Sequence, residues 1–103
     1  MLSTKANKRA SLLLKSDYTK AFEKDWKRLQ HSGQHDMHRL KEPMLLLIAN
    51  DGPLPPEWLD HELDGEWADH RELHAKGDLL LIYRLDGDSI IFVRAGSHSE
   101  LFG

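Results

Sequence analysis

The spacing of apolar residues changes once along the chain, and this change restricts the possible folds more than any other feature. Up to residue 50, apolar residues recur three or four positions apart, as on one face of a helix. Beyond residue 56 they alternate with a period of two, which is typical of half-buried strands. Asn50-Asp51-Gly52-Pro53 and Pro55-Pro56 separate the two regions. Helices in one half and strands in the other favour the α+β fold class.

The first half predicts two helices joined by a short loop. The first begins at Ser16 or Asp17, either of which can cap it, and continues to about Leu29. The second, from Met37 to Ile48, contains Pro43, which has no N–H to donate within a helix. This helix must therefore be kinked at Pro43, or restart with the proline in its first turn. Both alternatives give a helical hairpin.

The second half predicts three strands, at about residues 67–74, 79–85 and 89–96. Their separators, Lys76-Gly77-Asp78 and Asp86-Gly87-Asp88, contain the glycine that favours a tight turn. Short turns join antiparallel neighbours, so we expect a three-stranded meander with the helical hairpin packed on it.

Length and composition indicate the number of domains and the cellular compartment. A length of 103 residues favours one domain, and the polar, basic residues 1–10 predict a flexible N-terminal extension to a domain at residues 11–103. The absence of cysteine excludes disulfides and thiolate zinc sites. The longest apolar run, Met44–Ala49, is too short to cross a bilayer, and the N-terminus lacks a signal-peptide pattern. We therefore expect a cytoplasmic protein without membrane contacts.

Charge is distributed unevenly between the two halves. Residues 1–50 carry ten Lys or Arg and five Asp or Glu, whereas residues 51–103 carry four and twelve. The first half can therefore face the phosphates of a nucleic acid, although the whole chain has a net charge of -3. Ordinary solvated helix faces explain the same asymmetry equally well.

The meander places three ionisable residues at one end of the sheet: His74 closes one strand, Asp78 opens the next, and His98 follows the third. Because histidine titrates at about pH 6.5, two imidazoles can supply both a base and an acid. A metal site at His70 and His74 is not expected, since residues four apart in a strand stand about 13 Å apart. Any remaining metal site would use His74, Asp78 and His98 themselves.

Several segments together resemble the YafQ family of RelE-superfamily toxins, and the resemblance covers residue 11 to the end. The segments are Leu54-Pro55-Pro56, Asp60-His61-Glu62-Leu63-Asp64-Gly65-Glu66-Trp67, Arg71-Glu72-Leu73-His74, Leu81-Ile82-Tyr83-Arg84 and Gly96-Ser97-His98-Ser99-Glu100-Leu101-Phe102-Gly103. The resemblance implies a helical hairpin on a small antiparallel sheet, with Leu12–Leu14 as its first strand. Two residues depart from the family pattern: Pro43, and Leu79 in place of a common tryptophan.

The resemblance also implies an activity and its partners. The family cleaves mRNA in the ribosomal A site without a cofactor, and an antitoxin holds its members inactive. Matched residue by residue, the family's catalytic positions fall on His61, His74, Asp78 and His98, and its penultimate aromatic on Phe102. The expected partners are therefore a cognate antitoxin, the 70S ribosome and mRNA.

RNA cleavage through the 2′-hydroxyl needs a base, an acid and stabilisation of the charged phosphorane, but no metal. Our hypothesis makes His61 the base and His98 the acid, or the reverse, with His74 and Asp78 orienting or charging them. Arg94 would lie near the scissile phosphate, and Phe102 would stack on a base. The residues expected to bind ribosomal RNA are Lys20, Lys24, Lys27, Arg28, Arg39 and Lys41.

The alternative is a binding module with the same fold, either a gyrase-directed toxin or one that has lost activity. A gyrase-directed toxin has no reason to keep His61, His74 and His98 together, and Leu79 is the only sequence hint of an inactive toxin.

Overall fold

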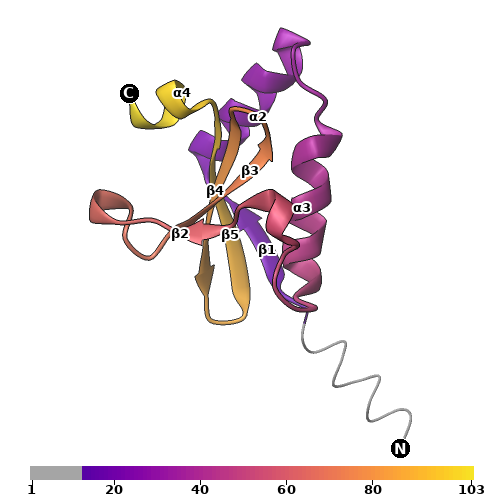
Figure 1. Cartoon of the computed structure of the whole chain (residues 1–103), viewed down its shortest axis with the longest axis vertical. Helices are drawn as coiled ribbons and strands as arrows, with labels where there is room; N and C mark the ends of the chain where they lie inside the picture. Colours follow the sequence, from indigo (N-terminus) through magenta and orange to yellow (C-terminus); the bar gives the residue numbers. More distant parts are fainter. Residues whose placement is uncertain (1–12) are drawn as a thin grey trace, which may run out of the picture.

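One sheet of five strands, in the order β1-β5-β4-β3-β2, organises the structure (Figure 1). The computed structural model describes residues 13–103, so the extension predicted at residues 1–10 lies outside the described residues. The strands are β1 (Lys15–Tyr18), β2 (His61–Glu62), β3 (Arg71–Lys76), β4 (Leu79–Asp86) and β5 (Ser89–Gly96). The helices are α2 (Lys20–Ser32), α3 (His38–Ala49) and α4 (His98–Phe102), with short 3-10 helices at Pro56–Trp58 and Gly65–Trp67. No helix in this part of the chain is both long and apolar enough to cross a membrane.

The predicted meander is confirmed as β3, β4 and β5, which are antiparallel neighbours. Gly77 and Gly87 occupy the two turns with φ of 54° and 60°, a left-handed conformation that glycine adopts readily. The first strand of the meander begins at Arg71, so the predicted start at Trp67 is wrong. Trp67 instead ends a 3-10 helix, and its carbonyl accepts a hydrogen bond from the His70 N–H.

The predicted start of the first helix is also wrong. Ser16 and Asp17 belong to β1, which pairs in parallel with β5, and α2 begins only at Lys20. The strand expected at Leu12–Leu14 begins at Lys15 instead, and Leu12 lies outside the described residues. All of β1 is exposed, so its position depends on backbone hydrogen bonds to β5 rather than on an apolar face.

Thr19 joins β1 to α2. Its side-chain oxygen accepts a hydrogen bond from the Phe22 N–H at 3.0 Å, as an N-cap does, and its hydroxyl donates to the Val93 carbonyl at 2.7 Å. One side chain therefore starts the helix and attaches it to the edge of β5.

Pro43 lies inside α3, which runs from His38 to Ala49 without a break. The alternative that places Pro43 in the first turn is wrong, because the helix begins five residues earlier at His38. Pro43 removes one helical hydrogen bond, but its side chain is fully buried, and this packing offsets the loss.

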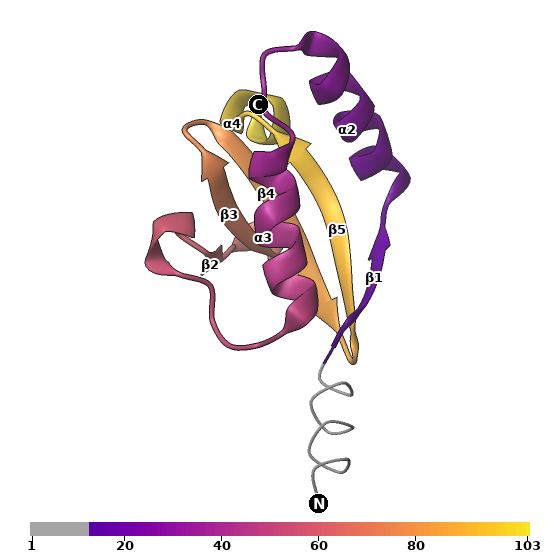
Figure 2. The same ribbon diagram turned by 90° about the vertical axis from the view of Figure 1, so that its right-hand side faces the viewer.

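Both faces of the sheet are buried at β4, which explains its unbroken apolar sequence. Leu79, Leu81 and Tyr83 pack with residues of α2 and α3 on one face, and Figure 2 shows α3 lying across that face. Leu80 and Ile82 pack on the opposite face with Leu101 of α4. The helical hairpin and the apolar side of α4 therefore pack on opposite faces of the sheet.

Candidate functional site

Two histidines and a glutamate lie together on strands β2 and β3. His61 is the register partner of Glu72, and His74 follows two residues later on the same face of β3. His61 Nε2 lies 3.6 Å from Glu72 Oε1, and His74 Nε2 lies 3.5 Å from the same oxygen. The Glu72 side chain is 8% exposed, whereas those of His61 and His74 are 48% and 34% exposed. A buried carboxylate thus lies between two imidazoles that solvent can reach.

The His61 ring is oriented by its other nitrogen. Nδ1 lies 2.7 Å from the carbonyl oxygen of Leu59, and because a carbonyl only accepts hydrogen bonds, Nδ1 must carry the proton. Nε2 is therefore the nitrogen left to take a proton from a substrate or give one to it.

The residue before His61 is anchored to the sheet. The buried Tyr83 hydroxyl donates to Asp60 Oδ1 at 2.6 Å, and Arg71 Nε donates to the same oxygen at 3.3 Å. Burial, reinforced by the Asp60 carboxylate, raises the pKa of Tyr83, so the hydroxyl remains protonated and keeps donating. These contacts fix the point at which the chain enters β2.

Asp78 and His98 are in direct contact at the end of the sheet. Asp78 Oδ1 accepts a hydrogen bond from the His98 backbone N–H at 3.1 Å. The His98 ring lies 5.0 Å from that of Phe102 between centroids, and Phe102 lies 6.0 Å from Trp67, edge to face. Phe102 is 37% exposed. Asp78 therefore holds the start of α4, whose two rings form a partly open aromatic surface.

Strand register relates these two groups to each other. His74 pairs with Leu80, and Leu80 pairs with Gly96, so the three residues lie side by side across β3, β4 and β5. Asp78 precedes this row and His98 follows it, which places the three predicted residues at one end of the sheet. The structure joins His61 to His74 through Glu72, and it joins Asp78 to His98 through the backbone.

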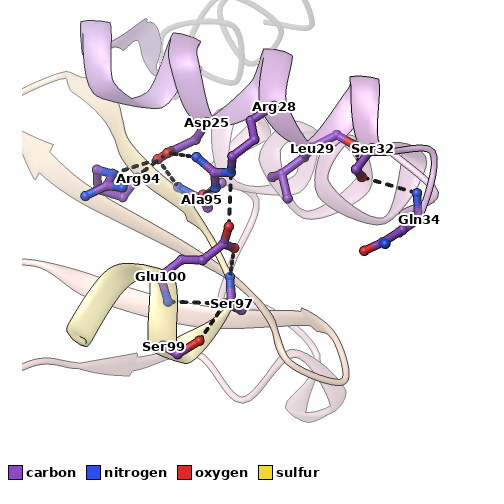
Figure 3. Close-up of polar contacts among 10 residues, drawn as sticks. All are labelled: Asp25, Arg28, Leu29, Ser32, Gln34, Arg94, Ala95, Ser97, Ser99 and Glu100. Atoms are coloured by element: carbon purple, nitrogen blue, oxygen red, sulfur yellow. Dashed lines mark hydrogen bonds and ion pairs between the residues drawn. The ribbon is translucent and has the colours of Figure 1, made fainter.

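Arg94 has a different partner from the scissile phosphate suggested by the sequence. Its Nε and Nη2 donate to Asp25 of α2 at 2.7 and 3.2 Å (Figure 3). Asp25 is 2% exposed and also accepts hydrogen bonds from the Ala95 N–H at 3.0 Å and from Arg28 Nη1 at 2.7 Å. The geometry makes Arg94 a bidentate partner of a buried carboxylate.

The hydrogen bonds among Asp25, Arg28, Arg94 and Ala95 shift the pKa values of Asp25 and Arg94. Burial by itself would raise the pKa of Asp25, but the hydrogen bonds from Arg94, Ala95 and Arg28 outweigh it and lower that pKa. The hydrogen bond to Asp25 raises the pKa of Arg94 in turn. Asp25 is therefore ionised at neutral pH despite its burial.

The basic residues expected to contact the ribosome fall into two groups. Lys27 pairs with Glu23 at 3.2 Å, and Arg28 pairs with both Asp25 and Glu100. Among the described residues, the others form no salt bridge, and all are exposed: they are Lys20, Lys24, Arg39 and Lys41.

The three groups on β2 and β3 also have the composition of a metal site. His61, Glu72 and His74 each offer a ligand atom, and these atoms lie within 4.8 Å of one another. Two imidazoles and a carboxylate suit zinc or copper. This set differs from the one that the sequence suggested for any metal, which was His74, Asp78 and His98.

The main functional candidate that sequence reasoning missed is Glu72. The sequence alone assigns it no role, yet it is the carboxylate that both histidines approach. The sequence does contain a signal for this: Glu72 and His74 are two residues apart in a strand, and such residues share a face of the sheet. Trp67, which the sequence placed at the start of a strand, contacts Phe102 beside His98.

Known bacterial toxins are similar to this chain in sequence and in fold. A family model described as "Bacterial toxin of type II toxin-antitoxin system, YafQ" matches residues 14–103. The mRNA interferase toxin YafQ of Escherichia coli K12 is 41% identical over 87 residues, which cover 84% of this chain and 94% of that protein.

Solved structures are similar over most of the chain. A crystal structure of the E. coli DinJ–YafQ complex matches with a TM-score of 0.79 and 40% identity, covering 87% of this chain and 99% of the matched one. A copper-bound mutant toxin from Helicobacter pylori matches with a TM-score of 0.80 and 41% identity, covering 87% of this chain and 100% of its own. Since the family model spans almost all of the described residues, the chain belongs to the YafQ family of toxins from type II toxin–antitoxin systems.

Proposed function

We propose that this chain is a ribosome-dependent endoribonuclease that cleaves translated mRNA in the A site and is held inactive by a cognate antitoxin. The observation that carries the proposal is that His74, Asp78 and His98 lie at one end of the sheet, with His61 linked to His74 through Glu72. The relative named an mRNA interferase supports the reaction, and the DinJ–YafQ complex supports an antitoxin partner. The place of action is the cytoplasm, where translated mRNA is found.

The reaction divides between two histidines. His61 Nε2 takes the proton from the 2′-hydroxyl, whose oxygen then attacks the adjacent phosphorus. The bond from phosphorus to the 5′-oxygen breaks, and His98 gives that oxygen a proton, which leaves a 2′,3′-cyclic phosphate and a 5′-hydroxyl. Exchange of the two roles gives the same products. The hydrogen bond from Nδ1 to Leu59 favours His61 as the base, because in the neutral ring it leaves Nε2 as the nitrogen without a proton.

The remaining site residues position these two. Glu72 lies close enough to His61 and His74 to stabilise a positive charge that develops on either ring. Asp78 holds the backbone of His98. Phe102, exposed beside His98, offers a face on which a substrate base stacks, a contact worth about 1–3 kcal/mol in single-stranded recognition.

The test is primer-extension mapping of a translated mRNA with purified protein, in the presence and absence of 70S ribosomes. We expect cuts within codons when ribosomes are present and weak or no cutting of free RNA. No cutting in either sample would contradict the proposal and favour a non-catalytic toxin of the same fold.

A second arm tests whether catalysis needs a metal. A copper-bound relative and the cluster of His61, Glu72 and His74 make a bound cation a real competitor to acid/base catalysis. Toxin dialysed against a chelator and returned to ribosome buffer should cut at the undiminished rate. Activity that disappears with the chelator and returns with added zinc or copper would refute the metal-independent mechanism.

The ion pairs remove two residues, Lys27 and Arg28, from the surface expected to bind ribosomal RNA. Four of the expected residues are exposed and form no salt bridge with a described residue: Lys20, Lys24, Arg39 and Lys41. Lys27 and Arg28 instead neutralise carboxylates of this chain. Exposed cations without a partner release counterions when they meet phosphate, which favours binding.

Reversing Lys20, Lys24 and Lys41 to glutamate should therefore weaken binding to vacant 70S ribosomes by at least about tenfold, and should flatten its salt dependence. Sedimentation with ribosomes at several salt concentrations measures both effects. Reversing Arg84, which already pairs with Asp86 at the far end of β4, is the matched control. Equal affinity for the triple variant and the wild type would contradict this surface.

A further inference from the structure

The helix that carries His98 and Phe102 is too short to be stable alone. α4 has five residues, whereas isolated helices need about 12–15 residues to form even marginally in water. Its only buried residue is Leu101, and Asp78 fixes only its first N–H. Some further contact must hold α4 in a fixed orientation.

Glu100 provides such a contact through both of its oxygens. Oε1 accepts a hydrogen bond from the Ser97 N–H at 2.8 Å, completing a capping box with the Ser97 hydroxyl. Oε2 lies 3.0 Å from Arg28 Nε in α2 (Figure 3). One carboxylate therefore both starts α4 and connects it to the helical hairpin.

Arg28 is itself fixed on the side away from α4. Its Nη1 donates to the buried Asp25 at 2.7 Å, and its Nη2 donates to the Ala95 carbonyl at 3.3 Å. The pair also packs closely over Gly96, where an added Cβ would lie 3.0 Å from both Arg28 Nη2 and Glu100 Oε1. A continuous path of short contacts thus leads from a buried carboxylate to α4.

We propose that Arg28 and Glu100 are positioning residues that hold α4, and with it His98 and Phe102, in the orientation that cleavage requires. The inference rests on the proposed function and changes the role of Arg28, which the sequence assigned to ribosome binding. The two roles predict different kinetics. A ribosome-binding residue acts on KM, whereas a residue that positions the acid acts on kcat.

The experiment compares Arg28→Gln, Glu100→Gln and the double variant on mRNA-programmed ribosomes. Glutamine at position 100 still accepts the Ser97 hydrogen bond but loses the ion pair, so the capping box survives. Because small misplacements of a catalytic group are costly, each single variant should lower kcat about tenfold with KM within about twofold. The double variant should be no slower than Arg28→Gln, since both changes break the same contact.

Arg84→Gln is the matched control, since Arg84 also pairs with a carboxylate and its side chain is 40% exposed against 43% for Arg28. Its kcat and KM should equal those of the wild type. Unchanged kcat in the Glu100 variant, or an increase in KM alone, would overturn the positioning role.

A second measurement is independent of cleavage. The Leu101 N–H donates to the Ser97 carbonyl within α4 at 3.1 Å, so its hydrogen exchange reports how firmly the helix is held. Exchange should be faster in Arg28→Gln and Glu100→Gln, but not in Arg84→Gln. If the wild type cuts no RNA, the proposed function is wrong. Hydrogen exchange at Leu101 still shows whether Arg28 and Glu100 stabilise α4. Equal exchange in all variants would overturn the inference.

Discussion

Replacing His98 with alanine should lower the single-turnover rate of mRNA cleavage by about 10²–10⁴-fold, the usual contribution of a general acid or base. The side chain lies beside the exposed Phe102 ring, while its backbone is held by Asp78. The substitution removes the imidazole and leaves the Asp78 hydrogen bond to the backbone intact. Binding to ribosomes should therefore equal that of the wild type.

The measurement is quenched-flow cleavage of mRNA on saturating programmed ribosomes, with His31→Ala as control, because His31 is exposed in the last turn of α2. An RNA whose scissile 5′-oxygen is replaced by sulfur separates the acid from the base, since a thiolate leaves without protonation. His98→Ala should recover most of its rate on this RNA, whereas His61→Ala should not. Undiminished cleavage of ordinary RNA by His98→Ala would refute its assignment.

Replacing Asp25 with alanine should destabilise the fold by about 3–5 kcal/mol, the cost of removing one member of a buried ion pair. Asp25 is 2% exposed and satisfies two guanidinium groups and the Ala95 N–H. Its loss leaves Arg94 facing α2 without a partner. Urea unfolding at pH 7 measures the effect, and Glu23→Ala, which removes an exposed ion pair on the same helix, should cost about 0.5 kcal/mol or less.

The same residue makes stability depend on pH. The pKa of Asp25 is lower in the folded protein than in the unfolded chain, where an aspartate titrates at about 3.9. Its contribution is therefore complete above that value and declines as the pH falls through the folded-state pKa. The difference between the wild type and Asp25→Ala should be largest at neutral pH and shrink in acid. A difference that is constant from pH 7 to pH 2 would contradict this linkage.

The sequence predicted the meander well because its signals are local. Alternating apolar residues and the glycines at positions 77 and 87 specify β3, β4 and β5 without knowledge of the rest of the chain. The turn positions then placed His74, Asp78 and His98 at one end of the sheet. Position 61 entered only through the family resemblance, since β2 has two residues and no period to detect.

Elements held by distant contacts were not predictable in the same way. β1 has no buried face, so its residues carry no alternation, and Ser16 and Asp17 were interpreted as helix caps. α4 is shorter than two turns and was not predicted at all. Arg94 was assigned to phosphate because a single sequence does not show that Asp25 lies opposite it. In each case the decisive partner lies far away along the chain.

The parallel pairing of β1 with β5 has a consequence for the time at which the protein becomes active. Thr19 at the end of β1 bonds to Val93, 74 residues later, so an emerging chain has no partner for its first strand until nearly all of the domain has been made. Contacts this distant slow folding, because a long loop must close before they form. The ion pair between Arg28 and Glu100 likewise cannot form until residue 100 has been made. We therefore expect the chain to complete its fold only after residue 93 has been made, which delays assembly of the end of the sheet that carries His98.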